Sequence, residues 1–362
     1  MSQSADALEF MGFQGCASDR EYYWHLAADT ERLWDRFPGV TSWEWTPADG
    51  CEVRPLEPAA MVKDMVEQGG WLLIGDSVTE NHFFSLSCLL YPHVRATPNY
   101  TENPYFDRAW PQHLYLSPSS PLLPTLALPP DFNISSTPLV TFRRVDLLLA
   151  QPQLEALYHT LRPNASAPLF SEEQFWSLAP EEYMALFDAP GARYGTLVVS
   201  TAGHWTTTLL AGFQDEGGIE GVLEFFRAAM ARWADEVQRA MDASARAAGR
   251  RRRRRQVVVR AYLPGHEDCH DERAPWTEWH PFRWNWYNWA SIGEFNAVFE
   301  NVTKEGEYPD IHFLPIDRPA LLRPDAHSSG DCLHIMSGAG VLEGWSHYIW
   351  HYVTREIPGR MR

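Results

Sequence analysis

The segment WLLIGDSVTENHFFSLSCLL, residues 71–90, is the part of this chain that most clearly indicates its fold. Its apolar start, WLLI, is followed by Gly75, and such a short run bounded by glycines is typical of a buried strand. The part from Glu80 onward predicts a buried helix. Ser77 then stands at a strand-to-helix turn, beside free N–H groups of a helix N-terminus that can stabilise an oxyanion. The plainer interpretation is that Asp76 or Ser77 only caps the helix.

Strand and helix patterns alternate outward from this segment. Further strands are predicted at TPLVTFRRVDLLL (137–149), YGTLVVST (194–201) and QVVVRAYL (256–263), and helices around 151–160, 171–187 and 218–249. Residues 95–140 are rich in Pro, Ser and Asn and predict a loop, whereas TSWEWTPADGC (41–51) predicts a strand and a turn. Strands alternating with helices indicate an α/β fold with a parallel sheet.

The composition limits the class of protein. The chain has 362 residues, of which 45% are apolar and 21% charged, so a fibrous or wholly disordered chain is excluded. The net charge of −17 argues against a nucleic-acid partner, which requires a basic face. We interpret the run Arg250–Arg255 as a solvated loop rather than a nuclear signal or phosphate patch. No window approaches the ~20 apolar residues that span a bilayer, and the first thirty residues lack a secretory signal pattern.

Asparagine and cysteine usage favours a secretory compartment, either the Golgi lumen or the extracellular space. Four of the nine asparagines stand in glycosylation sequons: Asn99, Asn133, Asn164 and Asn301. Chance predicts about one. The five cysteines form no CxxC pair, which fits two disulfides and a spare thiol better than a structural zinc site. The alternative is a cytosolic protein with incidental sequons and buried thiols.

A second polar motif, Asp331-Cys332-Leu333-His334, lies near the C-terminus. A nucleophilic serine needs a base within hydrogen-bond reach, and that base needs an orienting acid. The three-residue spacing can place Asp331 beside His334 on one turn. Alone, this motif is best explained as a helix N-cap and an ordinary histidine. Gly-Asp-Ser early with Asp-x-x-His late is, however, the chain order of the SGNH (GDSL-type) esterases and acyltransferases.

Five ordered segments carry a closer resemblance. They are WEWTPADGC (43–51), GDSVTENHFFSLSCLL (75–90), STAGHW (200–205), RPDAH (323–327) and DCLH (331–334). Together they resemble the trichome-birefringence-like polysaccharide O-acetyltransferases and their PC-esterase relatives, from about residue 43 to 350. The resemblance implies an SGNH-hydrolase-like α/β fold, with a parallel sheet flanked by helices and an extra N-terminal and Trp-rich lobe. Residues 1–65 would form the extension and minor-lobe segment, and 66–362 the acyltransferase or esterase domain.

The same resemblance implies roles for individual residues. Ser77 would attack an acyl carbonyl, His334 would take its proton, and Asp331 would hold the imidazole in the required tautomer. Asn81 would add its amide to the oxyanion hole, and Gly203 and His204 would line the pocket. The alternatives are a locally satisfied helix amide for Asn81 and a packed core histidine for His204.

The sequence also predicts substrate contacts and disulfides. The predicted substrate-binding residues are Arg144, Trp205 and Trp286. Exposed indoles stack on sugar faces, although most tryptophans here are expected to pack a core, and Arg144 beside Asp146 also fits an ion pair. The resemblance implies a Cys269–Cys332 disulfide and pairs Cys16 with Cys51.

The expected activity is acetyl transfer to polysaccharide hydroxyls through an acyl-serine, with acetyl-CoA or another acyl donor as co-substrate and no bound cofactor or metal. A carbohydrate acetylesterase is the nearest alternative. The chain departs from the family at Glu80, Thr206 and Ile335-Met336, so the donor and acceptor do not carry over.

Two further function classes stay open. The segment HEDCH (266–270) matches the H-E-x-x-H zinc motif. The flanking Pro264-Gly265 and Pro275 favour a polar loop instead of a zinc-binding helix. The other class is a non-catalytic glycan-binding module.

Overall fold

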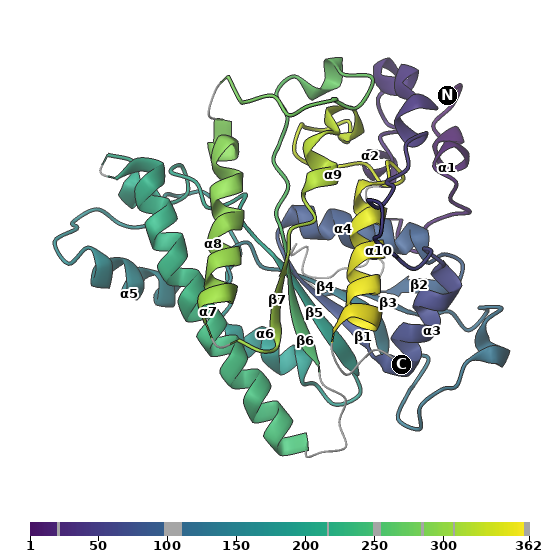
Figure 1. Ribbon diagram of the computed structural model, residues 1–362, viewed down its shortest axis with the longest axis horizontal. Helices are drawn as coiled ribbons and strands as arrows, with labels where there is room; N and C mark the ends of the chain where they lie inside the picture. Colours follow the sequence, from purple (N-terminus) through teal and green to yellow (C-terminus); the bar gives the residue numbers. More distant parts are fainter. Residues whose placement is uncertain are drawn as a thin grey trace.

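The computed structural model describes residues 1–19, 22–97, 111–215, 217–248, 255–283, 286–306 and 308–357. It contains a seven-stranded sheet in the order β2-β3-β4-β1-β5-β6-β7, flanked by helices (Figure 1). The strands are β1 (Gly70–Gly75), β2 (Val94–Thr97), β3 (Gln112–Leu116), β4 (Pro138–Arg144), β5 (Tyr194–Ser200), β6 (Gln256–Arg260) and β7 (Ile311–Leu314). The predicted α/β class is therefore confirmed.

The helices alternate with the strands along the chain. The α-helices are α1 (Asp6–Phe10), α2 (Tyr22–His25), α3 (Pro58–Gln68), α4 (Ser77–Leu89), α5 (Gln151–Leu161), α6 (Pro180–Phe187), α7 (Gly218–Ala248), α8 (Ile292–Glu305), α9 (Arg318–Leu321) and α10 (Val341–His351). The predicted boundary between residues 65 and 66 falls inside α3. No helix within the described ranges combines the length and apolar character needed to cross a membrane.

The sheet is parallel at its centre and antiparallel at one edge. Strand β1 pairs in parallel with β4 and β5, and β6 pairs in parallel with β5 and β7. Strands β2 and β3 add an antiparallel edge. The prediction of a loop over 95–140 was wrong for these two strands, because the pairing of β3 with β4 and of β2 with β3 outweighs a Pro- and Ser-rich surrounding sequence.

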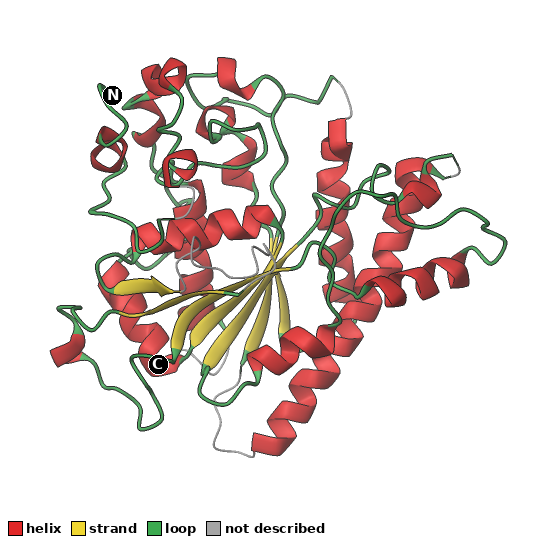
Figure 2. Ribbon diagram, turned by 180° about the vertical axis from the view of Figure 1, so that it is seen from behind, coloured by secondary structure: helices red, strands yellow, loops and turns green. Residues whose placement is uncertain are grey.

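Both faces of the central strand are buried, which explains its uninterrupted apolar sequence. Leu72 and Ile74 belong to one core, together with side chains of α7 and α8. Trp71 and Leu73 belong to a second core, together with side chains of α3 and α10. Figure 2 shows the sheet between these two helical layers. Ser77 is thereby fixed at the end of a strand that is packed on both sides.

The turn between β1 and α4 has little room. A Cβ at Gly75 would collide with the Thr79 hydroxyl and the Ser200 carbonyl, so only glycine fits there. Asp76 caps the helix, since its Oδ1 accepts the Val78 N–H at 3.0 Å. Ser77 is the first residue of the helix.

Two disulfides join distant parts of the chain. They are Cys16–Cys88 and Cys269–Cys332, and Cys51 is an exposed free thiol. The predicted Cys269–Cys332 bond is present, whereas the predicted Cys16–Cys51 bond was wrong. Cys16 lies instead beside the end of α4, where the Ala17 N–H donates to the Ser87 carbonyl at 3.0 Å. Two disulfides are consistent with an oxidising, secretory-pathway environment.

Two other predictions fall in irregular regions. Residues 43–48 have no regular secondary structure, so the strand predicted in the segment 41–51 was wrong. The backbone of 43–48 pairs with no strand among the described residues, and burial does not stabilise a strand there, since Trp43 and Trp45 are 52% and 41% exposed. Residues 250–254 of the arginine run lie outside the described residues, and Arg255 is buried against Phe187.

Candidate functional site

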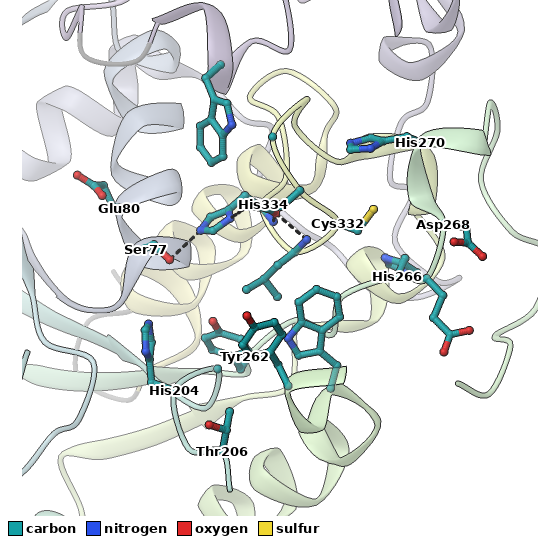
Figure 3. A pocket seen from close by; sticks show the side chains of 18 of the residues that line it. Ser77, Glu80, His204, Thr206, Tyr262, His266, Asp268, His270, Cys332 and His334 are labelled. Atoms are coloured by element: carbon teal, nitrogen blue, oxygen red, sulfur yellow. Dashed lines mark hydrogen bonds and ion pairs between the residues drawn. The ribbon is translucent and has the colours of Figure 1, made fainter. Parts of the chain in front are cut away.

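A pocket of about 810 Å³ lies at the carboxyl ends of the central strands. This is the edge at which open α/β sheets place their ligand sites. Figure 3 shows Ser77, His334, His204 and Tyr262 around it, with the loop that carries His266 and His270 along one side. Parts of the chain that are far apart in sequence therefore contribute to one site.

The structure brings together the three residues of the predicted triad. Ser77 Oγ lies 2.7 Å from His334 Nε2, and His334 Nδ1 lies 2.7 Å from Asp331 Oδ2 (Figure 3). The other carboxylate oxygen, Oδ1, accepts the N–H groups of Leu333 and His334, each at 2.8 Å. The acid is thus held by its own loop and directs one oxygen to the imidazole.

The contacts around Asp331 keep its carboxylate ionised. Burial acts to raise the pKa of Asp331, but the hydrogen bonds and charge of His334 outweigh it, and the pKa lies well below its ordinary value. A carboxylate beside Nδ1 requires a proton on that nitrogen. Nε2 of a neutral His334 is then left as the acceptor for the Ser77 hydroxyl proton.

Asn81 does not supply an oxyanion donor in this structure, so its predicted role is corrected. The side chain is fully buried, and its Nδ2 donates to His25 Nδ1 at 2.8 Å. Its Oδ1 accepts the Ile335 N–H at 2.9 Å, next to His334. Asn81 therefore links α4 to the loop that carries the imidazole, through partners that are distant in sequence rather than local ones.

Two residues of helix α2 complete this side of the site and were missed from the sequence. Besides its bond to Asn81, His25 stacks on Phe84 at 4.3 Å between ring centroids, and its carbonyl accepts the Ser337 N–H at 2.9 Å. Trp24 packs edge-on against the His334 ring at 5.2 Å and lines the pocket. The sequence holds no signal for these contacts, since α2 lies more than 300 residues before His334.

Gly203 and His204 line the pocket as predicted. A Cβ at Gly203 would collide with the hydroxyl of Tyr262, a buried residue two positions after the end of β6, so glycine is required there. Within the described part of the chain, neither the Ser77 N–H nor the Gly203 N–H has a hydrogen-bond acceptor. These two backbone groups are the candidates for an oxyanion hole in place of the Asn81 amide.

The predicted substrate-binding residues fall in different surroundings. Arg144 lines the pocket, but its Nε binds Asp146 at 2.9 Å and its guanidinium lies 4.2 Å from the centre of the Trp176 ring, so it is chiefly a buried ion pair. Trp205 is fully buried against Phe226, at 4.8 Å between ring centroids. An indole with no exposed surface cannot stack on a sugar, so the prediction for Trp205 is corrected. The Trp286 side chain lies outside the described residues.

The segment 266–270 forms a loop and a short 3-10 turn rather than a zinc-binding helix. His266 Nδ1 contacts His327 Nε2 at 2.7 Å, and His270 Nε2 contacts the Ser328 carbonyl at 3.0 Å. Glu267 forms an ion pair with Arg283 at 2.9 Å. The sulfurs of Cys269 and Cys332 lie close to His270, but they are bonded to each other. These side chains therefore do not present the donor set of an H-E-x-x-H site.

Comparison of the chain with protein-family models and with curated protein sequences gave no match.

Proposed function

We propose that this protein transfers acyl groups, most specifically acetyl, through an ester on Ser77. The observation that carries the proposal is the series of hydrogen bonds from Ser77 through His334 to Asp331, each 2.7 Å long. A serine hydroxyl is a weak nucleophile until a base takes its proton, and this series provides both the base and its orienting acid.

The geometry supports a double displacement. Ser77 Oγ attacks the donor's carbonyl carbon while His334 Nε2 takes the hydroxyl proton. The resulting oxyanion faces the N–H groups of Ser77 and Gly203, which are stronger partners for a full negative charge than for a carbonyl. Collapse of the tetrahedral intermediate breaks the bond to the leaving group, which receives the proton from His334. The second half repeats these steps with an acceptor hydroxyl, and Ser77 recovers its proton.

We propose a polysaccharide hydroxyl as the acceptor and acetyl-CoA or another activated acetyl ester as the donor. The support is the ordered resemblance to the polysaccharide O-acetyltransferases and the aromatic side chains Trp24, Tyr287 and Trp289 around the pocket. The alternative is an acetylesterase that uses the same residues. In that case water takes the place of the sugar hydroxyl in the second half.

For location, we propose the secretory pathway, in the Golgi lumen or outside the cell. The four sequons and the two disulfides support it.

The test is intact mass after brief exposure to an activated acetyl ester or to acetyl-CoA. Wild type, Ser77→Ala and His334→Ala are compared, each with and without a chelator, and circular dichroism verifies their fold. We expect one added acetyl group on the wild type, none on Ser77→Ala, and no effect of the chelator. A folded wild type that neither gains acetyl nor releases acetate would reject the proposal.

Glycan titration of the wild type and Ser77→Ala, taken together with the acylation result, separates the remaining function class. A non-catalytic module would bind saccharides equally well with and without Ser77 and would never be acylated. Loss of activity with the chelator would instead support a zinc hydrolase.

A further inference from the structure

A second cavity adjoins the Ser77 pocket. It has a volume of about 550 Å³, within the range of about 300–1,000 Å³ typical of sites for small organic ligands. The two cavities share the lining residues His266, Glu267, Asp268, Asp271 and Phe282. The two cavities therefore lie side by side and have these side chains in common.

The walls of the second cavity are aromatic. Trp276, Trp279, His280 and Phe282 all line it, and Trp279 is 47% exposed. Trp276 is fixed between two imidazoles, with ring centroids 5.0 Å from His266 and 4.6 Å from His280. An exposed indole beside a fixed aromatic wall is suited to stacking on the apolar face of a sugar ring.

The charges of the second cavity indicate which sugars fit. Four carboxylates line it, from Glu267, Asp268, Asp271 and Glu272, against the single arginine Arg283. Arg283 forms ion pairs with Glu267 and Asp268, so its positive charge is neutralised by residues that line the same cavity. The surplus of negative charge disfavours an anionic ligand and leaves a neutral one unaffected.

We propose that the second cavity is a distal binding site for a neutral oligosaccharide chain, whose acceptor hydroxyl reaches Ser77 from the adjoining pocket. The link to Ser77 chemistry rests on the proposed function, but binding of the chain does not require that chemistry. The ligand of this site is therefore a run of several consecutive uncharged sugar residues rather than a monosaccharide or a polyuronate.

Binding to Ser77→Ala, which cannot transfer acetyl, tests the proposal by calorimetry. The probes are neutral cello-, xylo- and manno-oligosaccharides of one to six units and, for comparison, oligogalacturonides of the same lengths. We expect the affinity for at least one neutral series to rise tenfold or more from one to four units. Oligogalacturonides should bind more weakly than the neutral series, with the difference reduced by salt.

Two variants in the Ser77→Ala background locate the effect. Trp279→Ala should abolish most of the gain with chain length, whereas Trp43→Ala, which removes a similarly exposed indole that lines neither cavity, should retain it. The double variant Asp271→Asn/Glu272→Gln should bind oligogalacturonides more tightly than its parent.

Three results would overturn the inference: affinity independent of length in all three neutral series, equal losses in the Trp279 and Trp43 variants, or a preference for oligogalacturonides. Acetylation of the wild type separates this outcome from the proposed function. An acylated enzyme without a chain-length effect rejects only the distal site. A chain-length effect in a protein that is never acylated rejects only the acyl transfer.

Discussion

Ser77 and Trp279 line the two adjoining cavities, and their surroundings are built differently. Ser77 follows a strand that is buried on both faces, and its partner His334 lies on a loop tied to α4 and α2 by buried hydrogen bonds through Asn81 and His25. Trp279 stands, half exposed, on an irregular loop between β6 and α8. Bond formation at Ser77 would need atoms held in precise positions, whereas stacking of Trp279 on a sugar tolerates a more mobile side chain.

The largest effect should come from the orienting acid. Asp331→Asn should lower kcat/KM for acetyl transfer roughly 10³–10⁴-fold, because an amide no longer favours the tautomer with its proton on Nδ1. Initial rates measure the change. The control is Asp131→Asn, since Asp131 is an exposed carboxylate outside the pocket, and it should keep wild-type rates. A small loss for Asp331→Asn would show that the triad geometry is not used.

The disulfide Cys269–Cys332 joins the loop between β6 and α8, which lines the second cavity, to the loop that carries Asp331 and His334. Its removal should therefore damage both cavities. It closes a separation of 63 residues, for which chain entropy predicts about 4 kcal/mol of stability. Denaturant unfolding of Cys269→Ser/Cys332→Ser should show a loss of about 2–4 kcal/mol, with lower activity even where the variant is folded. Cys16→Ser/Cys88→Ser is the matched control, with a similar separation of 72 residues but no cysteine lining either cavity. Equal activity losses in the two double variants would contradict a specific role in the site.

Low pH should decrease the free energy of unfolding through His266, which lines both cavities. Burial lowers the pKa of His266 to about 4, whereas a histidine in the unfolded chain titrates near 6.5. As the pH falls from about 6.5 to 4, only the unfolded state gains this proton, so the free energy of unfolding decreases by about 1.4 kcal/mol per pH unit and then levels off. His266→Gln should remove that part of the slope in urea titrations at several pH values. His159→Gln, at an exposed position, should leave the slope as it is.

The smallest effect should come from the contact between α2 and α4. His25→Phe retains an aromatic ring against Phe84 but removes the acceptor of the Asn81 amide. Loss of one buried partner costs about 1–3 kcal/mol, and a displaced His334 loop should lower kcat about tenfold with KM unchanged. A raised KM with unchanged kcat would indicate instead that His25 acts on the substrate. Phe10→Leu, at another aromatic position of the N-terminal segment that lines neither cavity, should leave both constants unchanged.

Local sequence patterns were sufficient to predict the central strands, the turn at Ser77 and the chain order of serine, acid and histidine. These features are local: an apolar run bounded by glycines, and two short motifs with fixed spacing. A sequence pattern can identify such features because each depends mainly on neighbouring residues. The pairing of His334 with Ser77 was also predictable, although only through the resemblance to a known family.

The side chains that face the pocket, and the partners of each buried polar atom, became known from the three-dimensional packing. Asn81 has the expected place on α4, but its amide donates a hydrogen bond to His25, on a helix more than fifty residues earlier in the chain. Trp205 belongs to a recognisable motif but lies in the core. Trp24 belongs to none of the motifs, yet its ring contacts His334. Cys16 likewise bonds Cys88 rather than Cys51. Such choices depend on how helices pack across the sheet, and that packing is decided by the burial of side chains distant in sequence.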